Sequence, residues 1–78
     1  MSKIQEYTKV KICKLIQNPD EYDGWRVNQR MPAIGDVGTL IDILHAEGLP
    51  DKYVVEKADT NGVPIWLSNF FEEELESE

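Results

Sequence analysis

The stretch that decides the fold is Ile34-Gly35-Asp36-Val37-Gly38-Thr39-Leu40-Ile41-Asp42-Ile43-Leu44. Its aliphatic and β-branched residues favour a strand, and Gly35 and Gly38 are typical of a strongly bent one. Side chains alternate between the two faces of a strand. The pattern therefore predicts a core-facing set of Val37, Thr39, Ile41 and Ile43, with Leu40, Asp42 and Leu44 on the other face.

The same residues leave a helix open as an alternative. Thr39 is a suitable N-cap, Asp42 lies three positions on, and Gly48 is a suitable residue just beyond a helix over 40–47. We favour the strand because the β-branched run comes directly before a second β-prone run.

Two further segments alternate with the period of two that is typical of half-buried strands, residues 7–16 and 53–58. The side chains predicted to face the core are Val10 and Ile12 in the first segment and Tyr53 and Val55 in the second. Asp59-Thr60-Asn61-Gly62 then predicts a tight hairpin turn. In the following strand, 63–67, Pro64 has no N–H for a ladder, which predicts either an edge position or an irregular start.

Near the C-terminus, Asn69 precedes an acidic run and Glu72 follows three residues later, which is typical of a capped turn. We predict a short helical or 3₁₀ turn there, followed by a last short strand near Leu75. Residues 17–33 are less regular, with turn chemistry at both ends. They are interpreted as an irregular strand or a long loop clamped by Trp25.

The length of 78 residues predicts a single domain. We assign it to residues 7–76, with a flexible N-terminus at 1–6 and a tail at 77–78. Cys13 is the only cysteine, which excludes an internal disulfide and favours a cytoplasmic location. The sequence contains no apolar run long enough to cross a bilayer.

The net charge of −7 is unevenly distributed. Residues 1–35 carry six basic and four acidic side chains, whereas residues 36–78 carry two basic and eleven acidic ones. This second part repels a phosphate backbone, so nucleic acid is disfavoured as a partner. A protein with a basic surface is favoured, and the oligomeric state is left open.

The candidate partner-binding residues lie in two places. Tryptophan and arginine recur at interface hot spots, and acidic residues beside aromatic ones suit a basic partner. The candidates are Trp25 and Arg26 in the irregular segment, and Trp66, Phe70, Phe71, Glu72, Glu73 and Glu74 near the C-terminus.

An alternative function uses a basic stripe in the first strand. Lys9 and Lys11 share a strand face, and Lys14 follows them. These three lysines are the candidate nucleic-acid face of a small barrel.

Catalysis and cofactor binding find little support in the sequence. A nucleophilic pair would have to combine the single cysteine, Cys13, with the single histidine, His45. His45 and Glu47 are too few ligands for a structural metal site, and no glycine loop has the spacing of a phosphate cradle. We therefore expect neither an enzyme nor a cofactor or metal.

Several of these segments together resemble a known family. Gly38-Thr39-Leu40-Ile41, Tyr53-Val54-Val55-Glu56, the turn at 59–62, Leu67 and Glu74-Leu75 resemble the small bacterial domains called DUF4926. The resemblance covers about residues 34–76. It implies a mainly β fold, a small SH3-like five-stranded antiparallel barrel. Some proteins of this kind resemble toxin immunity or antitoxin proteins, which implies a non-enzymatic interaction module.

Overall fold

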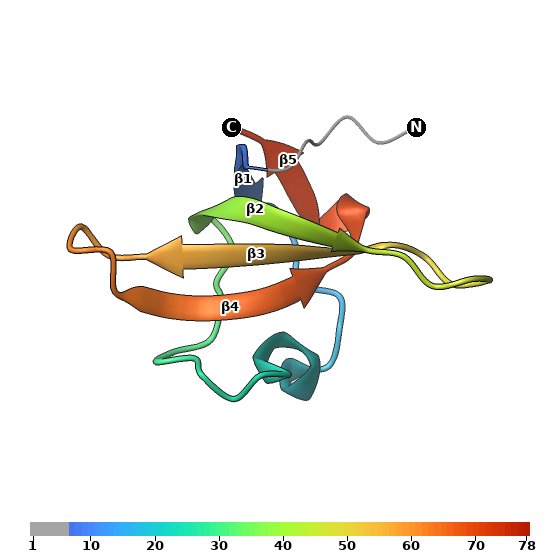
Figure 1. The fold of residues 1–78 in the computed structure, drawn as a ribbon, viewed down its shortest axis with the longest axis horizontal. Coiled ribbons are helices and arrows are strands. Elements are labelled where there is room, and N and C mark those ends of the chain that lie inside the picture. The colour runs from blue at the N-terminus through green and yellow to red at the C-terminus, as the bar shows by residue number, and fades with distance from the viewer. Residues whose placement is uncertain (1–6) are drawn as a thin grey trace.

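The computed structural model of the protein describes residues 7–78 as five strands and two short 3₁₀ turns (Figure 1). In chain order they are β1 (Lys9–Ile12), η1 (Pro19–Asp23), β2 (Val37–Leu44), β3 (Lys52–Ala58), β4 (Pro64–Phe70), η2 (Glu72–Glu74) and β5 (Leu75–Ser77). No α-helix occurs in this described part of the chain. The flexible N-terminus predicted at 1–6 lies outside the described residues.

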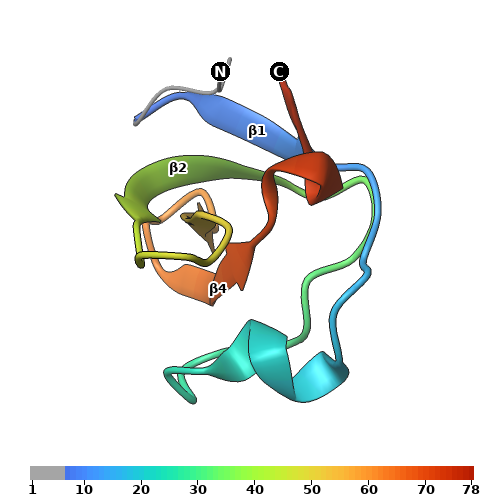
Figure 2. The same ribbon diagram turned by 90° about the vertical axis from the view of Figure 1, so that its right-hand side faces the viewer.

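The strands form one sheet in the order β4-β3-β2-β1-β5, and every neighbouring pair is antiparallel. Figure 2 shows that the sheet is curved, with η1 set apart from β1. The hydrogen-bonded ladder is not closed, because β4 and β5 are its two edges. The prediction of a mainly β fold, with a 3₁₀ turn before the last strand, is confirmed.

The core-facing side predicted for β2 is wrong in the first half of the strand. Gly38 and Leu40 are buried there, while their neighbours Val37, Thr39 and Ile41 are only half-buried. A bulge between Leu40 and Asp42 then shifts the register. Beyond the bulge, Ile43 lies opposite Tyr53 and packs against the core, as predicted.

The helix considered over 40–47 is also wrong, because β2 continues to Leu44. Residues 45–51 form a loop that projects beyond the sheet (Figure 1). The ends of this loop are joined by His45 and Asp51, whose Nδ1 and Oδ1 atoms lie 2.8 Å apart. Gly48 takes the positive φ of +78° that the turn requires.

The hairpin between β3 and β4 is confirmed. The Asp59 carboxylate accepts hydrogen bonds from the backbone N–H groups of Asn61 and Val63, each at 2.9 Å. Gly62 has a φ of +83°. Pro64 begins an edge strand, as its missing N–H predicts.

Residues 13–36 make a long excursion between β1 and β2, and Tyr22 rather than Trp25 clamps it. Tyr22 lies in η1, which packs against β4, and its ring centroid is 5.5 Å from that of Phe70. Trp25 remains 44% exposed, so the clamp predicted there is wrong. The chain continues along the edge of β4, where Gln29 N–H donates to the Ile65 carbonyl at 2.8 Å.

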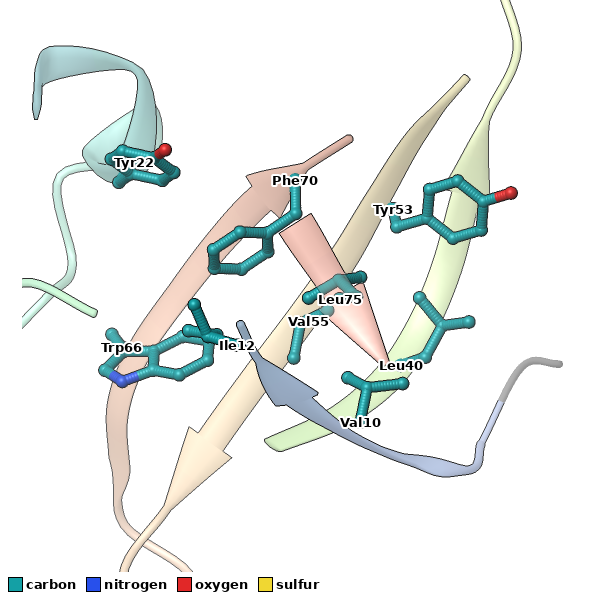
Figure 3. Close-up of a cluster of buried hydrophobic side chains, with 9 residues drawn as sticks. All are labelled: Val10, Ile12, Tyr22, Leu40, Tyr53, Val55, Trp66, Phe70 and Leu75. Atoms are coloured by element: carbon teal, nitrogen blue, oxygen red, sulfur yellow. The ribbon is translucent and has the colours of Figure 1, made fainter. Parts of the chain in front are cut away.

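The core is a single cluster enclosed by the curved sheet and η1 (Figure 3). Its buried members are Val10, Ile12, Tyr22, Leu40, Tyr53, Val55, Trp66, Phe70 and Leu75. The inward positions predicted for β1 and β3 are therefore confirmed. Trp66 and Phe70 meet edge to face with centroids 5.7 Å apart, a favourable aromatic geometry.

The C-terminal turn begins two residues later than the Asn69 cap predicts. Asn69 is part of β4, which extends to Phe70, and Phe71 takes the N-cap position. The Phe71 N–H is satisfied by the Glu74 carboxylate at 2.9 Å. β5 extends to Ser77, the first residue of the predicted tail.

Gly38 supplies the first testable prediction. A Cβ at this position would lie 2.8 Å from both the Glu56 carbonyl oxygen and Val55 Cγ1, so Gly38→Ala requires the β2–β3 pair to separate. Overpacking of this kind costs about 1 to 3 kcal/mol of unfolding free energy, measurable by urea denaturation. Gly24→Ala is the matched control, because nothing lies within 4 Å of its Cβ and its φ is −61°. Equal stability of the two variants would contradict the close approach.

Candidate functional site

An open cleft of about 400 Å³ lies where η2 meets the end of the β2–β3 loop. We call it the η2 cleft. It is lined by Ile16, Pro50, Asp51, Tyr53, Phe71, Glu72 and Glu73. Three segments far apart in the sequence therefore build it: the start of the excursion, the β2–β3 loop with the start of β3, and η2.

The cleft combines an apolar lining with an acidic one. Ile16 is 51% exposed and Phe71 is half-buried, so both present apolar surface to a ligand. Glu72 and Glu73 are exposed on η2, and neither is in an ion pair with any described residue. Among the ionisable groups of residues 7–78, the partner of Asp51 is His45, whose Nδ1 lies 2.8 Å from Asp51 Oδ1. The arrangement suits a ligand with both cationic and apolar groups.

Lys52 is not one of the residues that line the cleft, but its ammonium contacts Phe71, which is. Its Nζ lies 4.5 Å from the centroid of the Phe71 ring, within the range of a cation–π interaction. The same Nζ donates a hydrogen bond of 2.8 Å to Gln17 Oε1. No described carboxylate lies in an ion pair with it.

Glu74 lies behind the cleft, with a side chain that is fully buried. One carboxylate oxygen accepts hydrogen bonds from Ile16 N–H at 3.0 Å and from the Tyr22 hydroxyl. The other accepts from Gln17 Nε2 at 2.7 Å and from Phe71 N–H at 2.9 Å. Because Ile16 and Phe71 both line the cleft, this carboxylate fixes two of its walls.

The Tyr22 hydroxyl connects this carboxylate to η1. It donates to Glu74 and accepts from the Gln17 N–H at 2.9 Å. Burial, together with the hydrogen bond to Glu74, raises the pKa of Tyr22 to about 12. The phenol therefore keeps its proton, and with it the bond to Glu74, well above neutral pH.

A second polar cluster surrounds Asp36 just before β2. Its carboxylate binds Arg30 through two nitrogens at 2.7 and 3.2 Å, and accepts from Trp66 Nε1 and Ala33 N–H at 3.0 Å each. Burial alone would raise the pKa of Asp36, but these donors, led by Arg30, outweigh it and lower the pKa. The cluster fixes the end of the excursion against the core.

The structure separates the predicted C-terminal partner residues into two groups. Phe71, Glu72 and Glu73 line the cleft. Trp66, Phe70 and Glu74 are each fully buried and cannot touch a partner in this structure. Trp66 and Phe70 lie on the same, buried face of β4. The Glu74 side chain is buried because its carboxylate accepts hydrogen bonds from backbone N–H groups.

Trp25 and Arg26 lie outside the η2 cleft. Arg26 lines a separate open pocket of about 580 Å³ beside Asp20 and Asp23, and has a φ of +58°. The structure therefore does not bring this pair together with Phe71 and the two exposed glutamates.

The candidate nucleic-acid face is placed next to acidic residues. Lys9 and Lys14 are exposed, and Lys11 Nζ lies 3.7 Å from Glu76 Oε1 on the neighbouring strand β5. Because β5 pairs with β1, its carboxylate offsets part of the positive charge of the stripe.

The sequence did not identify four of the residues that line the cleft, which are Ile16, Pro50, Asp51 and Tyr53. It also did not identify Lys52, which contacts Phe71. Pro50 and Asp51 lie between two predicted strands and belong to no functional motif. Ile16 and Lys52 meet the other residues through tertiary contacts, so no local pattern marks them.

The candidate reactive side chains have separate partners. Cys13 Sγ donates weakly to the Glu73 carbonyl at 3.6 Å, whereas His45 contacts Asp51. Within residues 7–78, no cluster of three or more histidine, cysteine or acidic side chains has the geometry to hold a metal ion. The described part of the chain also has no helix long and apolar enough to span a membrane.

Comparison with known proteins gives no relative: no family model, curated protein or solved structure matches the chain.

The pKa of Tyr22 gives a prediction for alkaline stability. The folded protein holds the phenol proton more tightly than the unfolded chain, in which the pKa is about 10. The resulting stability is complete below about pH 10 and is lost as pH rises through about 12. A shift of this size corresponds to about 2 to 3 kcal/mol.

Urea unfolding of wild type and Tyr22→Phe between pH 8 and pH 12 measures this loss. We expect the stability difference between the two proteins to shrink over the upper two pH units. The exposed Tyr7 provides the control, because Tyr7→Phe should lose stability as wild type does. An equally steep alkaline loss in Tyr22→Phe would contradict the assignment.

Proposed function

We propose that this protein is a non-enzymatic interaction module that binds a partner protein with a basic surface at the η2 cleft. The observation that carries the proposal is the exposed pair Glu72 and Glu73, free of ion pairs with any described residue and adjacent to the apolar Phe71 and Ile16. Electrostatic complementarity of this kind accelerates association and sets specificity, while the apolar lining supplies surface to bury.

The proposal also includes a barrel fold and a family for the chain. We propose a small SH3-like barrel of the DUF4926 kind, acting in the cytoplasm as an immunity or antitoxin-like protein. Support comes from the antiparallel order β4-β3-β2-β1-β5, the curvature of the sheet, and the 3₁₀ turn directly before the last strand. The sequence resemblance over about 34–76 points in the same direction.

A nucleic-acid partner at Lys9, Lys11 and Lys14 is the weaker proposal. The contact between Lys11 and Glu76 reduces the positive field of this face. Binding to a phosphate backbone would also bring it toward the acidic second part of the chain.

The proposal predicts binding of cationic, partly apolar peptides. The probe is a fluorescein-labelled hexapeptide of alternating leucine and arginine, and its neutral counterpart has citrulline in place of arginine. We expect the arginine peptide to bind more tightly, as measured by fluorescence anisotropy at low salt. Glu72→Gln/Glu73→Gln should weaken that binding by about 3- to 10-fold, the range expected for removing two peripheral charges.

The matched control is Glu21→Gln/Glu78→Gln, which removes the same charge from exposed positions outside the cleft. It should leave the affinity within about twofold of wild type. Equal weakening in both double variants would show that only net charge matters, and would contradict binding at the η2 cleft.

A further inference from the structure

We propose that Lys52 occupies the cation position over the ring of Phe71, one wall of the η2 cleft, in the free protein, and that an arginine from a short basic segment of the partner replaces it against that ring. This inference rests on the proposed function and defines the partner's chemistry at the same site.

The Phe71 ring already serves as a cation-binding surface. The Lys52 ammonium lies 4.5 Å from its centroid, and Phe71 also lines the cleft. Arginine makes such contacts more often than lysine, and its guanidinium gives up its hydration more readily. An incoming arginine therefore competes well for this ring.

The hydrogen bonding of Lys52 makes the replacement possible. Its ammonium is held by one neutral acceptor, Gln17 Oε1 at 2.8 Å, and forms no ion pair with a described carboxylate. Lys52 is only half-buried, so water can satisfy the ammonium once it moves. Meanwhile Glu72 and Glu73 remain available to the guanidinium of the partner.

The size of the cleft limits the form of the partner segment. A volume of about 400 Å³ accommodates a few side chains rather than the surface of a whole domain. Ile16 and Pro50 offer apolar contacts beside the carboxylates. The ligand that fits is a short segment in which an arginine is next to an aliphatic residue.

The test compares Lys52→Met with Lys57→Met in anisotropy titrations with the leucine–arginine hexapeptide. Both variants remove one positive charge and keep a long side chain, but Lys57 Nζ contacts the Val37 carbonyl instead of Phe71. If Lys52 competes with the ligand, Lys52→Met should tighten binding at least about threefold more than Lys57→Met, in line with the strength of a cation–π contact.

Phe71→Leu completes the experiment as a double-variant cycle. On this background, Lys52→Met should tighten binding no more than Lys57→Met does, because the shared ring is gone. Thermal unfolding of each variant confirms that the titrated protein is folded.

Equal effects of Lys52→Met and Lys57→Met on wild-type background would overturn the inference while leaving the proposed function intact. Weaker binding by Lys52→Met would overturn it as well. A wild-type protein that binds the citrulline peptide as tightly as the arginine peptide would refute the proposed function itself, and the inference with it.

Discussion

The buried carboxylate of Glu74 is the interaction on which the rest of the structure depends. It accepts four hydrogen bonds, two from backbone N–H groups and two from the side chains of Gln17 and Tyr22. A buried carboxylate is costly unless its oxygens are satisfied, and hydrogen bonds to a charged group are stronger than neutral ones. With four donors in place, Glu74 joins the start of the excursion to the C-terminal turn.

This constraint explains how one long excursion becomes part of both the core and the cleft. Tyr22 packs on Phe70 with its ring while its hydroxyl meets Glu74, so the same side chain contributes apolar burial and a polar link. The link also places Ile16 beside Phe71, and these two residues form apolar walls of the η2 cleft. The acidic and apolar linings of the cleft are thus positioned by a group that no ligand reaches.

Local patterns predicted the parts of the fold that depend on short-range geometry. The alternating pattern of β1 and β3 identified the residues of these strands that face the core. The turn residues at 59–62 identified the hairpin between β3 and β4. The core-facing side of β2 was mispredicted because of Gly38. Glycine has no side chain, so the face that Gly38 shares with Leu40 carries only one apolar side chain in the first half of the strand and does not stand out in the sequence. Nothing near Tyr22 or Trp25 tells which aromatic ring enters the core, and nothing in the acidic run separates Glu74 from its neighbours. Both choices depend on contacts across about fifty residues of sequence.

The most direct measurement is amide hydrogen exchange and urea unfolding of Glu74→Gln beside the exposed control Glu73→Gln. If Glu74 is the central constraint, Glu74→Gln loses about 1 to 3 kcal/mol of stability, because an amide cannot accept all four bonds. The Ile16 and Phe71 amides should then exchange faster, in excess of any global loss, while Glu73→Gln behaves as wild type. Unchanged stability and unchanged protection of both amides in Glu74→Gln would contradict the account.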